Sequence, residues 1–348
     1  MMRANRLSWM IGTAAIAVAA MVMTSGPRLD AQSMTTNPFR PDYNWGELPE
    51  GRQWGATSAV DIAADGNIWV VERCGANTCV GSDVDPVLLF TKEGKLIRSF
   101  GKGMFAWPHG IHVDRDGNLW VTDAWQQKAT TTGHVVYKFS PEGTLLMTIG
   151  EPGMAGDPPN RLTRPSDVLT APNGEIYIIE AHDQSKNRVT KWTAEGKYIE
   201  TWGEAGYGPK QFHDPHALAM DSEGRIFVGD RYNNRIQIFD QKGTFLASWT
   251  QFGRPSGIFI DKDDTIYVAD SESSPAQDKY QGMRNAGWEK GIRVGDAKTG
   301  WLKYFLPDDR TNVLGYSGPE GVAVDSDGNI YGAEVTQRRV VKWVRFRP

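Results

Sequence analysis

Residues 107–125 read WPHGIHVDRDGNLWVTDAW, and variants of this stretch recur along the chain to give six copies. Each copy centres on a tight turn between two apolar runs. The six turns are DGNIW (65–69), DGNLW (116–120), NGEIY (173–177), EGRIF (223–227), DDTIY (263–267) and DGNIY (327–331). Asp-Gly and Asn-Gly pairs suit hairpin turns because glycine accepts positive φ, and the flanking runs alternate in period two, as half-buried strands do. Each copy therefore opens with a β-hairpin.

A second pair of strands follows most copies, for example VLLFTKEGKLIRSFG (87–101) and RIQIFDQKGTFLASWT (235–250). Four strands per unit and a repeat of about 40 to 60 residues are typical of the blades of a β-propeller. The sequence thus predicts an all-β fold: a six-bladed β-propeller whose four-stranded blades surround a central channel.

The last copy ends at RVVKWVRFRP (339–348), which supplies a third strand but no fourth. An open ring would expose an unpaired strand edge, and closed folds avoid such edges. We therefore expect a segment near Phe39 to Leu48 to add the missing outer strand and to close the ring.

The N-terminal region differs from the repeats. Arg3 and Arg6 precede an apolar run over residues 9–23, which polar residues and Ala31 follow. This order is typical of an export signal, and the run is short for a membrane span. We expect a signal peptide at 1–31, a segment at 32–54 that closes the ring, and the propeller at 55–348. The mature protein would be periplasmic or secreted, without stable membrane insertion; an uncleaved anchor is the alternative.

Composition excludes one class of partner. The net charge is −4 and the isoelectric point is about 5.9, so the chain offers no basic footprint for nucleic acid. Because the repeat takes up nearly all of the chain, we expect one propeller domain and a monomer.

The chain has two cysteines, Cys74 and Cys79, in the loop after the first hairpin. In an oxidising compartment they would close a small disulfide loop. Free thiols and a metal-binding pair are the competing interpretations, but two cysteines alone are a weak metal signal.

One position of the repeat alternates in a way that packing does not explain. Nine residues before each turn stand Ser58, His109, Ser166, His216, Ser256 and Glu320. This position starts the innermost strand of each blade, so the six residues should ring the mouth of the channel. Two imidazoles and one carboxylate from alternate blades leave room for a cation with an open coordination position, as in catalytic sites. We predict a metal site of His109, His216 and Glu320, with Zn²⁺ the first choice and another divalent metal the second; the alternative is that each histidine only caps its strand.

The ends of the second strands should lie on the same face as this site. Arg73 and Arg231 stand there, and His182 follows the equivalent residue of the third blade. Two guanidiniums beside a cation suit an anionic substrate held by bidentate contacts. Simple pairing with a sequence neighbour, Arg73 with Glu72 or Arg231 with Asp230, is the alternative. Insertions at 74–86, 125–134, 182–187 and 271–291 should form the walls of a pocket there.

Three segments carry a resemblance to a known family: PHGIHVDRDGNLWVTDA, ETWGEAGYGPKQFHDPHALAMDSEGRIFVGDRYNNRIQIF and PEGVAVDSDGNIYGAEV. Over residues 55–345 the chain resembles NHL-repeat six-bladed propellers, and most closely the peptidyl-α-hydroxyglycine α-amidating lyases. The resemblance implies cleavage of a C–N bond to give an amide and glyoxylate, at a zinc ion held by three histidines.

The resemblance places His109 and His216 on the first two zinc ligands and Arg73 and Arg231 on two arginines of the family. The third ligand falls on Glu320, which is a departure. The essential tyrosine of the family falls on or near His182, which is a second departure. The expected base is then His182, which as a histidine titrates near neutrality, or a metal-bound hydroxide. The family's structural calcium uses an acidic residue where Gly321 stands, so calcium is not assumed.

These observations favour an exported, metal-dependent lyase that acts on a small molecule or peptide bearing a carboxylate. The catalytic residues would be Arg73, His182 and Arg231. A lactonase-like metal-dependent hydrolase and a non-catalytic NHL binding module are the alternatives.

Overall fold

The computed structural model describes residues 37–125, 131–182, 186–274, 284–309 and 317–346. The expected signal peptide at 1–31 lies outside the described residues, so it remains a prediction. Among the described residues, no helix has the length and hydropathy that a membrane span needs.

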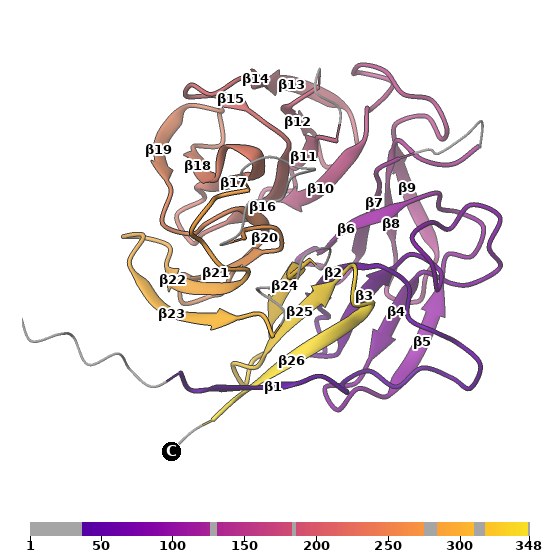
Figure 1. The fold of residues 1–348 in the computed structure, drawn as a ribbon. Coiled ribbons are helices and arrows are strands. Elements are labelled where there is room, and N and C mark those ends of the chain that lie inside the picture. Colours follow the sequence, from indigo (N-terminus) through magenta and orange to yellow (C-terminus); the bar gives the residue numbers. More distant parts are fainter. Residues whose placement is uncertain (1–36, 126–130, 183–185, 275–283, 310–316, 347–348) are drawn as a thin grey trace, which may run out of the picture. The chain divides into compact units, whose positions relative to one another are not determined.

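Six antiparallel sheets of four strands make up the fold, and the prediction of a six-bladed β-propeller is confirmed (Figure 1). Blade one is β2 (Thr57–Ile62), β3 (Ile68–Glu72), β4 (Val87–Phe90) and β5 (Leu96–Phe100). Blade two is β6 (Pro108–Val113), β7 (Leu119–Asp123), β8 (Val135–Phe139) and β9 (Leu145–Ile149). Blade three is β10 (Pro165–Thr170), β11 (Ile176–Glu180), β12 (Arg188–Trp192) and β13 (Tyr198–Trp202). Blade four is β16 (Pro215–Met220), β17 (Ile226–Asp230), β18 (Arg235–Phe239) and β19 (Phe245–Trp249). Blade five is β20 (Pro255–Ile260), β21 (Thr265–Asp270), β22 (Gly291–Asp296) and β23 (Leu302–Pro307). Blade six is β24 (Pro319–Val324), β25 (Ile330–Glu334), β26 (Arg339–Arg345) and β1 (Phe39–Asp42).

Two smaller features interrupt this pattern. A short parallel pair, β14 (Glu204–Ala205) and β15 (Gln211–Phe212), lies between blades three and four. The 3-10 turn η1 (Arg231–Asn233) follows β17 and is the one helical element of the described residues.

Ring closure comes from the N-terminal strand. Strand β1 pairs antiparallel with β26, from Phe39 opposite Arg345 to Asp42 opposite Lys342. It lies within the segment that the sequence predicted to close the ring, and Figure 1 shows the indigo and yellow ends of the chain side by side. The first strands of neighbouring blades contact one another all the way round, including β2 with β24.

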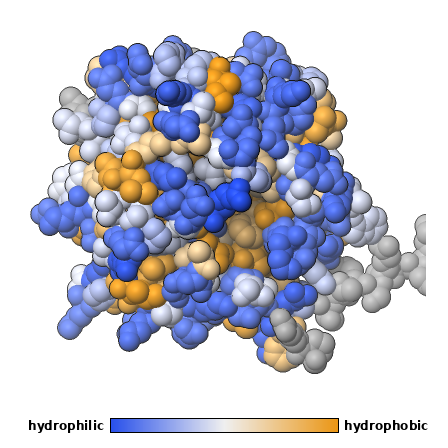
Figure 2. All heavy atoms as spheres, turned by 180° about the vertical axis from the view of Figure 1, so that it is seen from behind, coloured by the Kyte–Doolittle hydropathy of each residue, from blue (hydrophilic) through white to orange (hydrophobic). Residues whose placement is uncertain are grey.

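The hydrophobic core is divided among the six interfaces between blades. Each interface holds one cluster of buried side chains, contributed by both of the blades that meet there. The large buried aromatic residues include Trp69, Trp120 and Trp192, each 1% exposed. The face shown in Figure 2 is mostly hydrophilic, with apolar side chains in separate groups. Stability therefore depends on every blade having two neighbours.

Each blade also ends its second strand with a buried carboxylate. These residues are Glu72, Asp123, Glu180, Asp230, Asp270 and Glu334, and none is more than 1% exposed. Five of them accept hydrogen bonds from backbone N–H groups in the segment that leads into the first strand of the same blade. Five form an ion pair with an arginine. Because buried polar groups need such partners, these carboxylates fix the backbone just before the channel-facing residues.

The disulfide prediction is confirmed. Cys74 and Cys79 are bonded, with an S–S distance of 1.99 Å. Their loop follows β3 and carries Asn77, whose side chain contacts Arg73. The bond therefore restrains one side of the channel mouth.

Replacement of Phe39 by alanine tests the contribution of the closing strand. Phe39 is 9% exposed and packs in the cluster between blades five and six. We expect Phe39→Ala to lower the free energy of unfolding by about 3 kcal/mol, as removal of a buried phenylalanine does. Denaturant titration measures the change. Leu246→Ala is the control, because Leu246 is 48% exposed in β19 of blade four; equal losses in both variants would contradict the role of the closing strand.

Candidate metal centre

A β-bulge sits at the start of every innermost strand. The pairing of first and second strands shifts register there in all six blades. The residues at the second position of these strands are Ser58, His109, Ser166, His216, Ser256 and Glu320. A bulge disrupts the ladder and re-aims a side chain, and all six residues line one narrow cavity of about 50 Å³. The alternating ring predicted from the sequence therefore surrounds a common space.

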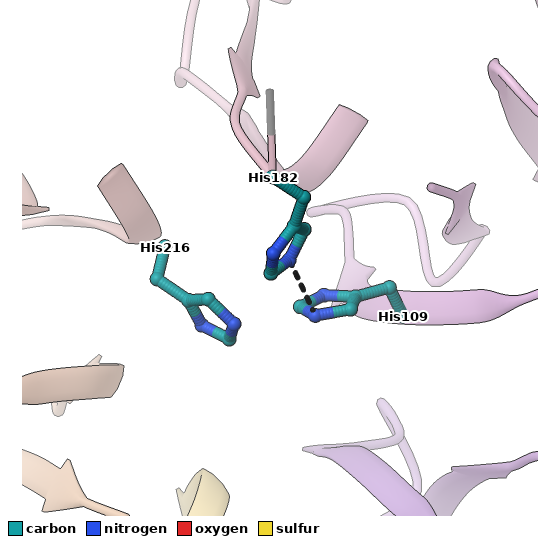
Figure 3. A group of neighbouring side chains, drawn as sticks. All are labelled: His109, His182 and His216. Carbon is teal, nitrogen blue, oxygen red and sulfur yellow. Dashed lines mark hydrogen bonds between the residues drawn. The ribbon is translucent and has the colours of Figure 1, made fainter. Parts of the chain in front are cut away.

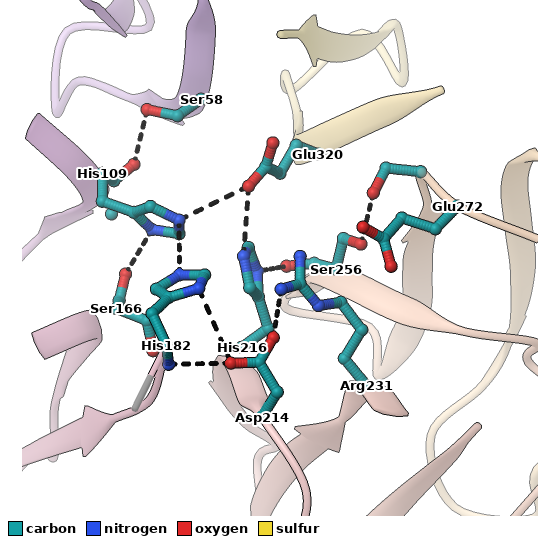
Figure 4. A network of polar contacts seen from close by, with 12 residues as sticks. Ser58, His109, Ser166, His182, Asp214, His216, Arg231, Ser256, Glu272 and Glu320 are labelled. Atoms are coloured by element: carbon teal, nitrogen blue, oxygen red, sulfur yellow. Dashed lines mark hydrogen bonds and ion pairs between the residues drawn. The ribbon is translucent and has the colours of Figure 1, made fainter. Parts of the chain in front are cut away.

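The serines hold the histidines through their backbone. His109 Nδ1 donates to the carbonyl of Ser166 at 2.8 Å, and His216 Nδ1 donates to the carbonyl of Ser256 at 2.7 Å (Figure 4). A carbonyl only accepts, so the proton of each neutral imidazole stays on Nδ1. Burial lowers the pKa of His109 to about 4, which keeps that imidazole neutral. The Nε2 lone pairs of both histidines therefore face the channel.

Glu320 lies opposite these two lone pairs. Its Oε1 atom is 3.4 Å from His109 Nε2 and 3.1 Å from His216 Nε2. His216 Nε2 is buried and makes no hydrogen bond of ordinary geometry. A carboxylate at neutral pH also offers only acceptors. Acceptor atoms that face one another repel unless a proton or a cation lies between them, so this group of atoms suits a cation.

His182 also reaches the cluster, from the loop after β11 (Figure 3). Its Nε2 atom is 3.1 Å from His109 Nε2, and the three histidines offer nitrogens that all lie within 4.8 Å of one another. Its backbone adopts a left-handed conformation with φ of 55°, and its backbone N–H donates to Asp214 Oδ1 at 2.7 Å. Strained backbone of this kind is often found at functional sites.

Three distances among these donors match the spacing of ligands around a metal ion. In a tetrahedral zinc site with bonds of about 2.0–2.1 Å, ligand atoms lie about 3.3 Å apart. Among His109, His216, Glu320 and His182, the three contacts are 3.1, 3.1 and 3.4 Å. Nitrogen and carboxylate donors suit zinc among the common metals. Three of these residues are the predicted ligands, and His182 is a fourth potential donor.

Asp214 connects His182 to Arg231. Its carboxylate forms an ion pair with the Arg231 guanidinium, and its Oδ1 atom lies 3.6 Å from His182 Nδ1. Burial alone would raise the pKa of Asp214, but the adjacent Arg231 holds it well below its usual range. Burial also lowers the pKa of His182 well below its ordinary value. The neutral imidazole thus has a carboxylate beside Nδ1, which favours the proton there and a free lone pair on Nε2.

Arg73 is buried beside the cluster, at 1% exposure. Its guanidinium lies over the ring of Trp107 at 3.7 Å, and that ring is 5.1 Å from the ring of His109. Nε donates to the carbonyl of Pro108 and Nη1 to Asn77, whereas Nη2 is buried without a hydrogen-bond partner among the described residues. Burial lowers the pKa of Arg73 to about 10. A buried donor without an acceptor is costly, so this atom suits an anionic ligand.

The alternative pairings with sequence neighbours do not occur. Glu72 pairs with Arg52 and Asp230 pairs with Arg235. Sequence reasoning missed Asp214 and Trp107 altogether. Their position in the sequence was the available signal, because each comes two residues before a channel-facing histidine.

Family models match two parts of the chain. The NHL repeat model matches residues 212–239, which include His216 and Arg231, and the strictosidine synthase-like N-terminal model matches residues 309–335. A likeness to solved structures concerns the fold alone. A gluconolactonase of Xanthomonas campestris aligns with a TM-score of 0.56 and 13% identity, over 84% of this chain and 86% of that one.

Curated relatives are more similar in sequence. NHL repeat-containing protein 3 of Homo sapiens is 31% identical over 61% of this chain and 59% of its own length. Peptidyl-glycine alpha-amidating monooxygenase B of Xenopus laevis is 30% identical over 75% of this chain and 28% of its own length. The chain thus spans less than two thirds of each of these relatives. It is an NHL-repeat-containing six-bladed β-propeller that resembles the peptidyl-α-hydroxyglycine α-amidating lyases.

Proposed function

We propose that the protein is an exported, metal-dependent lyase that cleaves the C–N bond next to an α-hydroxyl group and releases glyoxylate or a related acid. The convergence of acceptor atoms at the channel axis carries this proposal. His109 and His216 each present an unprotonated Nε2 to Oε1 of Glu320, at 3.4 and 3.1 Å. Relatives at about 30% identity include amidating enzymes, which supports the reaction class.

His109, His216 and Glu320 would hold a divalent cation, with Zn²⁺ as the proposed metal. Three protein ligands leave a coordination position for substrate, as in catalytic zinc sites. When bound, the cation supplies Lewis acidity and lowers the pKa of an alcohol that coordinates it. Glu320 brings a negative charge that a third histidine would not, so the site would be a weaker Lewis acid than one of three histidines.

His182 is the proposed base. Its Nε2 atom points into the cluster, and its low pKa keeps it unprotonated at neutral pH. Asp214, 3.6 Å from Nδ1, favours the tautomer in which Nε2 accepts a proton. His182 would take the proton of the α-hydroxyl, the C–N bond would break, and its electron pair would leave with the amide nitrogen. That nitrogen then takes a proton, so the products are an amide and an aldehyde acid.

The two arginines have different proposed roles. Arg73, with its unpaired Nη2, would bind the carboxylate beside the reacting carbon. Arg231 is already paired with Asp214, so it would act mainly by holding that carboxylate against His182. This division differs from the shared substrate contact expected from the sequence.

Export and a monomeric state belong to the same proposal. The disulfide between Cys74 and Cys79 is a feature of oxidising compartments. The face in Figure 2 has apolar side chains only in separate groups, whereas interaction surfaces are usually contiguous apolar patches. A monomeric enzyme of the periplasm or the exterior fits both observations.

Glyoxylate release from α-hydroxyhippurate by purified, zinc-supplemented protein tests the reaction directly. Glyoxylate and benzamide in equal amounts are the expected result. Lactone hydrolysis without glyoxylate release would favour the hydrolase alternative, and stoichiometric metal without either activity would favour a binding module.

His216→Ala tests the metal and its role together. We expect metal content, measured by elemental analysis, to fall from about one ion per chain to a trace. Turnover should fall on the order of a thousandfold, since such an ion supplies several kcal/mol to the transition state. Circular dichroism should remain unchanged, because the clusters between blades do not include His216. His213→Ala is the matched control and should keep its metal. Full turnover by His216→Ala would remove the catalytic assignment.

Arg73→Ala tests the carboxylate contact. We expect kcat/KM for α-hydroxyhippurate to fall roughly tenfold to a hundredfold, as loss of a charged hydrogen bond predicts. The carboxamide analogue of the same compound should be affected less than threefold. Arg52→Ala, which removes an arginine paired with Glu72, is the control. An equal loss for the acid and the carboxamide would show that Arg73 does not recognise the carboxylate.

A further inference from the structure

A pocket of about 320 Å³ opens beside the histidine cluster, and His182 and Asp214 form part of its wall. Its other walls include three aromatic residues, Trp107, Trp125 and Tyr232. Trp107 packs edge to face against both Trp125 and His182, with ring centroids 5.9 and 5.4 Å apart. The pocket thus lies beside the proposed base and is lined in part by aromatic side chains.

Each aromatic wall has a guanidinium against it. Arg73 lies over Trp107 at 3.7 Å, and Arg164 lies over Trp125 at 5.0 Å. Tyr232 has Arg254 at 4.2 Å and Arg231 at 5.0 Å. An aromatic cage ordinarily suits an ammonium ion, but here the positive charges already belong to the protein. Arg231 and Arg254 are paired with Asp214 and Glu272. Arg73 and Arg164 bring further positive charge, so the pocket suits a ligand that is flat, apolar and negatively charged.

Three buried donors have no hydrogen-bond partner among the described residues; one belongs to Trp107 of the pocket wall, and two belong to arginines that lie against the rings of Trp107 and Tyr232. They are Nη2 of Arg73, Nε1 of Trp107 and Nε of Arg231. Unsatisfied buried donors are rare and costly in folded proteins. A ligand that brings several acceptor oxygens would satisfy them.

We propose that the pocket selects N-aroyl α-hydroxyglycines, in which an aromatic acyl group is attached to the nitrogen of the bond that breaks. This assignment rests on the proposed function. The aryl ring packs against Trp125 and Tyr232, the acyl carbonyl accepts from Trp107 Nε1, and the carboxylate binds Arg73. A volume of about 320 Å³ is at the small end for ligand sites, which matches one aromatic acid better than several residues of a peptide.

Binding of two unreactive ligands tests the pocket apart from the reaction. N-benzoylglycine and N-acetylglycine both carry the carboxylate and the amide but lack the α-hydroxyl. Calorimetry with zinc-loaded protein should give N-benzoylglycine an affinity at least tenfold higher, since an aromatic contact adds about that much. Equal affinities for the two ligands would overturn the proposal.

Trp125→Ala should lower the affinity for N-benzoylglycine about tenfold and change the affinity for N-acetylglycine less than twofold. Tyr232→Ala should act in the same direction, and it provides a second test if Trp125→Ala folds poorly. Trp301→Ala is the matched control because Trp301 is 60% exposed. An equal loss for both ligands in Trp125→Ala and Tyr232→Ala would contradict the assignment.

Turnover separates this inference from the proposed function. If the protein prefers N-benzoylglycine but releases no glyoxylate from α-hydroxyhippurate, the pocket assignment stands and the proposed reaction fails. If glyoxylate forms with equal kcat/KM from the benzoyl and acetyl forms of α-hydroxyglycine, the reaction stands and the pocket assignment fails.

Discussion

Closure of the ring is the constraint on which the rest of the structure depends. The core is shared among six interfaces, so each blade is buried only if both of its neighbours are in place. The pairing of β1 with β26 joins the two ends of the chain at the sixth blade. Only in a closed ring do the bulges at the starts of the inner strands face a common axis. A local pairing near the termini thereby sets the positions of residues from every blade.

Buried carboxylates fix the backbone that leads into the channel-facing strands. Asp123, for example, accepts the backbone N–H groups of Ala106 and Trp107 at 2.9 and 2.6 Å, directly before the strand that carries His109. The carbonyls of Ser166 and Ser256 then orient the two imidazoles from the neighbouring blades. Each histidine is thus positioned by its own blade and oriented by the next. The backbone carbonyl of the serine in that next blade accepts the imidazole N–H, so the backbone of the serine matters as much as its small side chain.

Much of the fold and part of the site could be predicted from the sequence because their causes are local. Turn chemistry and period-two alternation define the blades, and counting from the turns finds His109, His216 and Glu320 at equivalent positions. The approach of His182 to His109 could not be predicted, since it depends on a left-handed backbone in a loop and on the distance between two blades.

The pairing of Arg231 was also beyond sequence reasoning. Proximity along the chain suggested Asp230, but that carboxylate is buried and pairs with Arg235 across the neighbouring strand. The partner is Asp214, from the loop before the blade's first strand. Arg231 begins the turn η1 after β17 ends at Asp230, so its pairing at the mouth depends on which segments the ring brings together.

The balance of charge at the axis helps Arg73 to tolerate burial, and its Nη2 has no hydrogen-bond partner among the described residues. Burial lowers the pKa of Arg73, while the charges of Glu320 and Asp123 act to raise it. In the proposed function, a cation held by Glu320 would offset that carboxylate's charge and weaken its support of the guanidinium. A substrate carboxylate would then be the group that balances Arg73. Occupation of the metal site and binding of an acid should therefore favour each other, and linkage makes this effect equal in both directions.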